Sequence, residues 1–325
     1  MPLTAGPAPG LPFMGTPFGC VEASPAHPLP PELAESSGIV QGDPSRSAPL
    51  DPAAHVPPDP SDDRTPPFFW SHNDSGHPPD LFAIDGQGEL LGITRVTGAQ
   101  NVDWEELSAG PCPSGRTGRA GDPGDPGQPG HTARCLYIAD VGDNLEQRTD
   151  PAIYRIPEPR PGDSVSAPAE RFALELPDGP RDIEAVYLLP GERLFLITKG
   201  RNHPVEIYRV PPLTSPDRPL RVTRIQTLTP GPPSLPRLVT GASASEDGRW
   251  VAIRTYETLE FFTPSEEGTL APTPQGRLNL RPLREPQGEA IAILDGGHVV
   301  LTSEAGPGLE LGMMQFLHCP GLSPR

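Results

Sequence analysis

Short runs of β-branched, aliphatic and aromatic residues follow one another along most of the chain. Typical runs are FFWSHNDSG (68–76), CLYIADVGDN (135–144) and RLFLITKGRN (193–202), and each is bounded by Gly, Pro, Asp or Asn. Such runs are typical of short strands separated by turns. No segment keeps a 3.6-residue period between capping residues, so we expect no long helix. The pattern predicts an all-β protein.

The runs repeat as a module that occurs five times. A module opens with a segment that carries an acidic residue followed by small and aliphatic residues. A second strand with a polar tail comes next, then a third strand and usually a fourth. The opening segments are ESSGIV (35–40), DWEELSAG (103–110), DIEAVYLL (182–189), VTGASASEDG (239–248) and GEAIAILDGG (288–297). Four short strands at a period of roughly 50 residues are typical of a propeller blade.

We therefore predict a single β-propeller of four-stranded blades over residues 31–319, with five blades favoured and six possible if an insert hides one. The last module lacks a fourth strand, and residues 18–30 are placed to supply it and close the ring. Residues 1–30 are otherwise expected to be flexible. Inserts interrupt the modules at 41–66 and 113–134. The second insert carries Gly-X-Y triplets, too few for a collagen helix, and we interpret it as a surface loop.

The charge of the chain narrows the class of partner. The formal net charge is −17 over 325 residues. Nucleic acids and anionic membrane surfaces need clustered Lys and Arg, so neither is expected as a partner. No run of 18 apolar residues occurs, and a transmembrane segment is therefore not expected. The acidity fits a soluble monomer that attracts a cation or a basic ligand, although it also serves solubility alone.

The cysteines favour an oxidising compartment. Cys112 and Cys135 flank the Gly-rich insert on two strands that we expect to be neighbours, so a disulfide between them is predicted. Cys20 and Cys319 lie where the ring would close and are a possible second disulfide, with lipidation of Cys20 or simple burial as alternatives. We expect an extracytoplasmic protein, secreted, periplasmic or surface-anchored. The proline-rich N-terminus nevertheless has no basic region and shows no clear signal peptide.

The opening segments supply the candidate site. First strands line the channel of a propeller, and four of the five segments place a glutamate in the register expected to face it, whereas the fourth has Thr240. These channel residues are Glu35, Glu105, Glu184 and Glu289, with Asp143 and Asn144 joining from a polar tail. Converging carboxylates need a cation or shared protons, and oxygen ligands suit Ca²⁺ or Mg²⁺. Supporting polar residues are Asn73, Asp74, Asp103, Asp140, Asp182, Lys199, Arg254 and Glu304.

Alternatives to a cation site stay open. Lys199 or Arg254 could neutralise the glutamates through salt bridges, and the Asp and Asn tails could serve only as turn residues. Nucleophilic catalysis has little support, because GASAS (241–245) lacks the final Gly of a nucleophile elbow. His72 could be a base, but a single histidine near a strand end is more often structural.

Several motifs, taken in order, resemble one group of proteins. They are WSHNDSG, NVDWEELSAGPC, CLYIADVGDN, DIEAVYLL, LITKG, GASASEDGR, RTYE and QGEAIAIL, and they span about residues 35–316. In this order they are similar to bacterial extracytoplasmic β-propellers grouped loosely with phytase-like and esterase-like proteins. The resemblance implies a propeller fold, export and an acidic channel, but no established reaction.

Three functions fit these observations. The first is binding of a ligand or divalent cation at the acidic channel, with Ca²⁺ as the candidate cation. The second is metal-dependent hydrolysis of an ester or phosphate ester, and the third is a non-catalytic scaffold for protein interaction. The fold alone does not choose among them.

Overall fold

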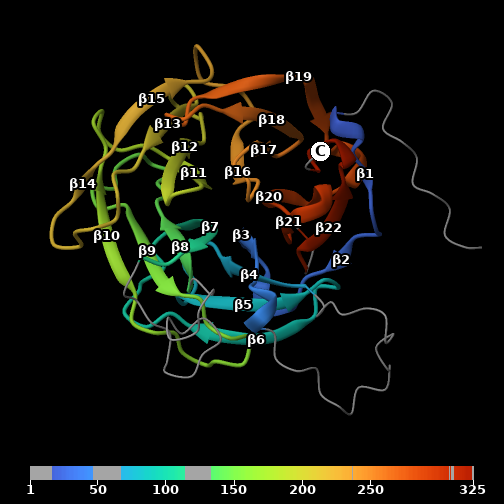
Figure 1. Cartoon of the computed structure of the whole chain (residues 1–325), viewed down its shortest axis with the longest axis horizontal. Coiled ribbons are helices and arrows are strands. Elements are labelled where there is room, and N and C mark those ends of the chain that lie inside the picture. Colours follow the sequence, from blue (N-terminus) through green and yellow to red (C-terminus); the bar gives the residue numbers. More distant parts are fainter. Residues whose placement is uncertain are drawn as a thin grey trace, which may run out of the picture.

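Five sheets form a ring around a central axis (Figure 1), and their strands pair antiparallel except where β14 (Leu220–Arg221) joins β10 (Glu170–Glu175) in parallel. The computed structural model describes residues 17–46, 67–113, 133–235, 237–306, 308 and 311–323, so residues 1–16 and most of both predicted inserts lie outside the described part. The described part contains strands and short 3₁₀ turns, without an α-helix. None of its helical turns has the length and apolar character needed to cross a membrane. The structure is the five-bladed propeller that the repeats favoured, rather than the six-bladed form.

Each blade runs outward from the axis in chain order. Blade 1 contains β3 (Ser36–Gln41), β4 (Phe68–Asn73), β5 (Asp80–Asp85) and β6 (Leu90–Arg95). Blade 2 contains β7 (Trp104–Pro111), β8 (Arg134–Asp140), β9 (Ala152–Pro157) and β10 (Glu170–Glu175), with the short β14 (Leu220–Arg221) added at its outer edge. Blade 3 contains β11 (Ile183–Leu189), β12 (Arg193–Thr198), β13 (Glu206–Arg209) and β15 (Thr223–Thr227). Blade 4 contains β16 (Val239–Ala244), β17 (Val251–Thr255), β18 (Thr258–Pro264) and β19 (Leu270–Asn279).

Blade 5 joins the two ends of the chain. Its first three strands are β20 (Gln287–Ile293), β21 (His298–Glu304) and β22 (Met313–His318). The N-terminal β1 (Val21–Glu22) and β2 (His27–Pro28) pair with β22 and complete the sheet, as Figure 1 shows in blue beside red. A disulfide between Cys20 and Cys319 lies next to this pairing. The ring is therefore closed by hydrogen bonds and by a covalent bond.

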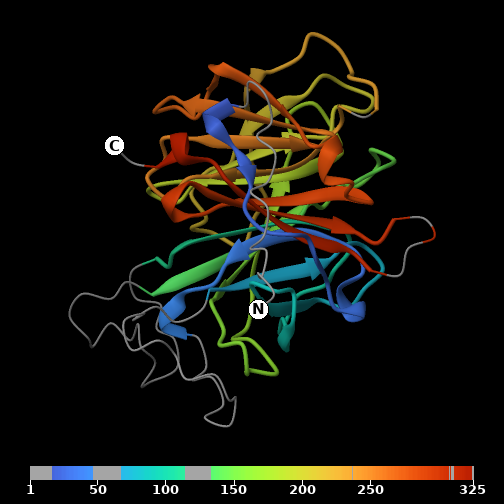
Figure 2. The same cartoon turned by 90° about the vertical axis from the view of Figure 1, so that its right-hand side faces the viewer.

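The hydrophobic core lies between the blades. Five clusters of buried side chains occur in the described part, and each contains residues of two neighbouring blades. Trp70 and Trp104, for example, are fully buried between blades 1 and 2. The blades follow one another around the axis (Figures 1 and 2), and because a core cluster lies between each neighbouring pair, every sheet buries both faces. This explains why the strands read as nearly continuous apolar runs rather than as alternating ones.

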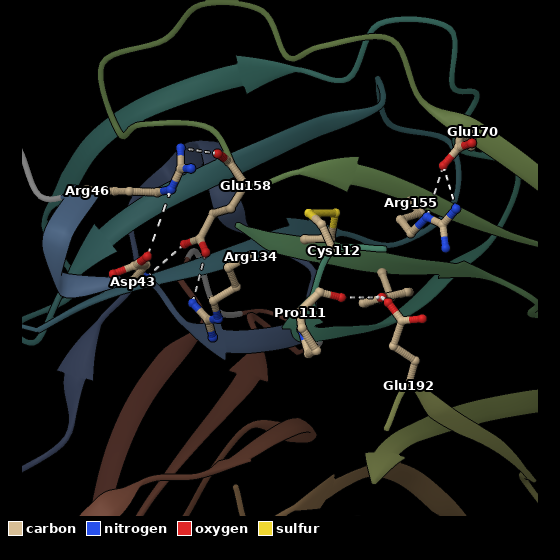
Figure 3. The surroundings of a disulfide bond; sticks show 11 residues. Asp43, Arg46, Pro111, Cys112, Arg134, Arg155, Glu158, Glu170 and Glu192 are labelled. Atoms are coloured by element: carbon tan, nitrogen blue, oxygen red, sulfur yellow. Dashed lines mark hydrogen bonds and ion pairs between the residues drawn. A yellow bond between two sulfur atoms is a disulfide. The ribbon is translucent and has the colours of Figure 1, made fainter. Parts of the chain in front are cut away.

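A second disulfide joins Cys112 to Cys135, as the sequence predicted. Figure 3 shows polar side chains gathered beside it around Glu158. The Glu158 carboxylate accepts hydrogen bonds from the Asp43 amide (2.9 Å) and from Arg134 (2.9 Å). Its carbonyl accepts one from Arg46 (2.7 Å). These bonds hold together the points at which the chain leaves β3 and enters β8.

Candidate functional site: carboxylates at one end of the channel

Each inner strand carries a β-bulge near its start. The pairing with the second strand shifts by one residue between Ser36 and Gly38, Trp104 and Glu106, Ile183 and Ala185, Val239 and Gly241, and Gly288 and Ile291. A bulge inserts one residue and re-aims its side chain. The residues within the bulges are Ser37, Glu105, Glu184, Thr240 and, next to Ala290, Glu289, and all are buried. Because the five strands meet around the axis, we call this set the inner tier of the channel (Figure 1).

The bulge in β3 shows that our prediction for the first module placed the wrong residue in the channel. Ser37, and not Glu35, occupies the position equivalent to Glu105, since Ser36 pairs with Asn73 as Trp104 pairs with Asp140. Glu35 lies two residues earlier, where Asp103, Asp182 and Gln287 stand in other blades. We call these four residues the outer tier. The Glu35 carboxylate lies 2.8 Å from His77 Nε2, and both side chains are partly exposed at the rim.

Three carboxylates converge where blades 1 and 2 meet. One oxygen each from Asp74, Asp103 and Glu105 lies within 4.8 Å of the others. Asp74 comes from the β4–β5 turn, Asp103 from the outer tier and Glu105 from the inner tier. The side chains of Asp74 and Asp103 are within hydrogen-bonding reach of each other. The buried Oδ1 of Asp103 has no hydrogen-bond partner in the described part of the chain.

Burial and mutual repulsion leave these carboxylates poorly neutralised. Burial, and then the Asp74 charge, raises the pKa of Asp103 to about 7. Burial, followed by the charges of Glu184, Asp74 and Asp103, raises the pKa of Glu105 well above its usual range. Carboxyl groups this close share protons or bind a cation. An oxygen-only donor set of this kind suits Ca²⁺ or Mg²⁺.

A glycine in the DVGDN motif makes room for this cluster. A Cβ atom on Gly142 would lie 2.1 Å from Glu105 Oε1 and 2.5 Å from Asp103 Oδ2. Both distances are far shorter than any real contact of this kind. The glycine therefore lets the β8–β9 loop pack directly against the two carboxylates. The DVGDN motif therefore supports the cluster through Gly142, which has no side chain, as well as through its acidic residues.

Lys199 supplies the one buried positive charge that contacts an inner-tier carboxylate within the described residues. Its ammonium lies 2.5 Å from Glu184 Oε1. Burial raises the pKa of Glu184 to about 8, although Lys199 opposes the shift, and the nearby Asp182 adds to it. Asp182 is also buried and accepts the Asp143 amide (3.3 Å). One lysine therefore faces several carboxylates and neutralises only part of their charge.

Blade 5 contributes a second acidic pair. The Gln287 amide donates to Glu289 Oε1 (3.0 Å) and to Glu304 Oε2 (2.5 Å). Burial raises the pKa of both glutamates, and that of Glu304 reaches about 7. The Tyr256 phenol lies near enough for the Glu289 charge to raise its pKa further, after burial. Glu304 thus joins the cluster from the end of the second strand, as Lys199 does in blade 3.

The remaining predicted residues orient loops or lie apart. Asp140 accepts the Asp103 amide (2.9 Å), and Asp143 accepts the Arg148 amide (2.6 Å). Asn73 bonds the backbone of Glu35 and Glu32. Asn144 lies at the exposed rim and accepts from Arg201 (2.6 Å) rather than facing the inner tier. Arg254 pairs with Glu285 (2.6 Å) instead of the channel glutamates.

Glu106 is a buried channel residue that sequence analysis missed. Its carboxylate accepts backbone N–H bonds from Leu107 (3.0 Å) and Ala242 (3.1 Å), so it links β7 to β16 across the ring. The sequence did contain a signal for this residue, because Glu105 and Glu106 are adjacent. In a regular strand, neighbouring side chains point to opposite faces, so one of the two glutamates would point away from the channel. The bulge in β7 allows both to be buried.

His72 is fully buried against Trp104, and burial lowers its pKa to about 4, which suits a structural role.

Comparisons with known proteins give only distant likenesses to solved structures. No family model and no curated protein matches the chain. Among solved structures, the PQQ-bound aldose sugar dehydrogenase of Streptomyces coelicolor is 10% identical, with TM-score 0.45, covering 92% of this chain and 98% of that one. The calcium-binding regucalcin of Agrobacterium tumefaciens is 12% identical, with TM-score 0.42 and 95% coverage of both chains. The Xanthomonas campestris gluconolactonase is 16% identical, with TM-score 0.36, covering 77% of this chain and 68% of that one.

Proposed function

We propose that this propeller binds a divalent cation through Asp74, Asp103 and Glu105 and presents it to a ligand at the open end of the channel. The observation that supports this most directly is the approach of three carboxylate oxygens within 4.8 Å of one another. A buried Asp103 oxygen without a partner in the described residues adds to it. Gly142 also packs its backbone against Glu105 and Asp103, at a position where any side chain would clash with these carboxylates.

Ca²⁺ is the better candidate of the two hard cations. Ca²⁺ accepts six to eight oxygens in flexible geometry, whereas Mg²⁺ demands a near-ideal octahedron. Asp74 comes from a turn of blade 1, whereas Asp103 and Glu105 come from two different tiers of blade 2. The arrangement of the three carboxylates is therefore irregular. Bound Ca²⁺ would hold Asp103 and Glu105 ionised, offset their repulsion and keep free positions for a ligand's oxygens.

Chelation and a single substitution test the site. We expect that EDTA lowers the melting temperature of the wild-type protein and that added Ca²⁺ restores it, because a ligand of the folded state stabilises it by mass action. Glu105→Gln keeps the shape of the side chain but removes one ligand charge. We expect it to abolish this response. Calorimetric titration with Ca²⁺ and Mg²⁺ gives the affinities directly.

Glu267→Gln is the matched control for this substitution. Glu267 is an exposed residue of the β18–β19 turn, and its substitution by Gln changes the net charge by the same amount as Glu105→Gln. Its variant should respond to EDTA and Ca²⁺ as the wild type does. A wild-type protein whose melting temperature and titration show no effect of either cation contradicts the proposed function.

Ester or phosphate-ester hydrolysis remains a second candidate because of Glu304. A cation at the cluster would polarise a substrate oxygen, and catalysis would also need a base nearby. Glu304 is partly exposed at the same end of the channel, with a pKa raised to about 7 by burial and by the charges of Asp74 and Glu35. An esterase and phosphatase screen with and without EDTA separates the two functions. Turnover that EDTA abolishes would add hydrolysis to binding.

We infer further that the protein works in an extracytoplasmic, oxidising compartment. The two disulfides support this, because such bonds rarely persist in a reducing cytosol. Both lie within the fold, one at ring closure and one between the first two strands of blade 2. Their formation is thus part of reaching the folded state.

A further inference from the structure

A cavity of about 770 Å³ opens beside the acidic pair of blade 5, Glu289 and Glu304. Tyr256 and Gln287 belong to its lining, and the same two residues adjoin Glu289 and Glu304. The wall of the cavity is therefore next to Glu304, which lies near enough to Asp74 for the charge of Asp74 to raise its pKa. Its volume falls within the range of roughly 300–1,000 Å³ that is usual for small-molecule sites.

Three arginines line this cavity in an otherwise strongly acidic protein. They are Arg201 from the β12–β13 loop, Arg281 from the 3₁₀ turn η4 (Arg281–Leu283), and Arg284 directly after that turn. Arg281 is paired with Glu257 (2.5 Å). Arg201 bonds only the neutral amide of Asn144 (2.6 Å) within the described residues. The Arg284 side chain makes no hydrogen bond or ion pair to any residue that the structure describes.

The carboxylates that line the cavity are already neutralised. Glu257 is held by Arg281, and Glu285 by the buried Arg254 (2.6 Å). Arg201 and Arg284 thus leave two guanidinium charges without a carboxylate partner in the described part of the chain. The cavity is positive on one side and adjoins a cluster of negative charges on the other.

Arg284 also has an unusual backbone conformation. Its φ is 57°, in the left-handed region that glycine adopts at no cost and other residues rarely enter. Glycine would fit this C-terminal position of η4 better, so an arginine here is not explained by the turn. Strain of this kind is often associated with ligand sites.

We propose that the cavity binds the acidic group of a small organic anion, a carboxylate or a phosphate, whose other end reaches the cation. The guanidinium fork matches both groups bidentately. Apolar lining residues, among them Leu235, Leu238 and Pro233, would contact the organic body of the ligand. Contact with the cation rests on the proposed function, whereas recognition of the anion by Arg201 and Arg284 does not.

Three probes with the same aromatic body test the anion site: benzoate, phenyl phosphate and the neutral benzamide. Each is titrated into the full-length protein by ligand-observed NMR, first in EDTA and then in Ca²⁺. We expect benzoate or phenyl phosphate to bind in EDTA at least about tenfold more tightly than benzamide. The tighter of the two identifies the acidic group. Ca²⁺ should raise the affinity for that anion, and the anion should raise the affinity for Ca²⁺ by the same factor.

Arg284→Gln and Arg201→Gln should each weaken anion binding about tenfold or more in EDTA, without loss of the Ca²⁺-dependent melting shift. Arg218→Gln, an exposed arginine that does not line the cavity, is the control and should bind like the wild type. Equal binding of benzamide and the anions, or unchanged binding in both cavity variants, overturns the proposal. Anion binding without any effect of Ca²⁺ would overturn contact with the cation. Absence of Ca²⁺ binding would contradict the proposed function, while the titrations in EDTA still decide the anion site.

Discussion

At the scale of single residues, the carboxyl groups of the channel control how stability depends on pH. Burial raises the pKa of Asp103 and Glu304 to about 7 and that of Glu184 to about 8, from ordinary values near 4. Between these limits the folded protein holds protons that the unfolded chain has already released. The free energy of unfolding must therefore fall as pH rises through this window when no cation is bound.

We expect the melting temperature in EDTA to fall by several degrees between pH 5 and pH 8.5. With saturating Ca²⁺ the decline should be smaller, because the cation holds the carboxylates ionised and offsets their repulsion. A pH series of melting curves with and without Ca²⁺ measures both effects. Glu105→Gln should lose the difference between the two series. A melting temperature that rises with pH in EDTA would contradict the repulsion that we infer.

At the scale of elements, a buried arginine joins blade 4 to blade 5. Arg254 on β17 donates to the carbonyls of Ala290 (2.7 Å) on β20 and Thr302 (3.0 Å) on β21, and it pairs with Glu285. Gly288 leaves the space that the guanidinium fills, since a Cβ there would lie 1.9 Å from Nη2. Arg254 thus holds strands together, and its ion pair is with Glu285 rather than with Glu105, Glu184 or Glu289.

We expect Arg254→Ala to lower the free energy of unfolding by about 3–5 kcal/mol, because it leaves the Glu285 carboxylate buried without its partner. Urea denaturation measures this loss. Arg277→Ala is the control, since Arg277 pairs with Glu260 at the exposed surface of blade 4 and such a pair contributes only about 0.2–1 kcal/mol. The Ca²⁺-dependent melting shift should survive in folded Arg254→Ala. Loss of this melting shift would show instead that the cation site depends on Arg254.

At the scale of the whole molecule, ring closure depends on segments from opposite ends of the chain. The Cys20–Cys319 disulfide spans 299 residues, whereas Cys112–Cys135 spans 23. Loop-closure entropy predicts stabilisation of about 6 kcal/mol for the first and about 3 kcal/mol for the second. The double variant Cys20→Ser, Cys319→Ser should therefore lose more stability than Cys112→Ser, Cys135→Ser.

Urea denaturation of the two double variants checks this order. The first variant should also expose the pairing of β1 with β22 to earlier hydrogen exchange, because the outer strand of blade 5 is then held only by hydrogen bonds. The second variant should leave that exchange unchanged. A greater loss in the second variant, or free thiols in unreduced exported protein, would contradict the role that we assign to ring closure.

The sequence by itself determined the repeat and most of its strands. Apolar runs bounded by turn residues marked every inner and second strand, because a propeller blade is local in sequence and each strand pairs with the next. The disulfide at the base of the Gly-rich insert followed from the same locality, since Cys112 and Cys135 lie on consecutive strands. The predicted propeller and its preferred number of blades depended on nothing beyond this pattern.

Only the tertiary structure decided which side chains share the channel. A bulge in each inner strand interrupts the two-residue alternation, so Ser37 rather than Glu35 belongs to the inner tier and Glu106 is buried as well as Glu105. The approach of Asp74 to Asp103, and of the arginine-lined cavity to the acidic pair of blade 5, joins residues of different blades. Such contacts depend on how the blades are arranged around the axis, and a local pattern of hydrophobic and polar positions does not contain that information.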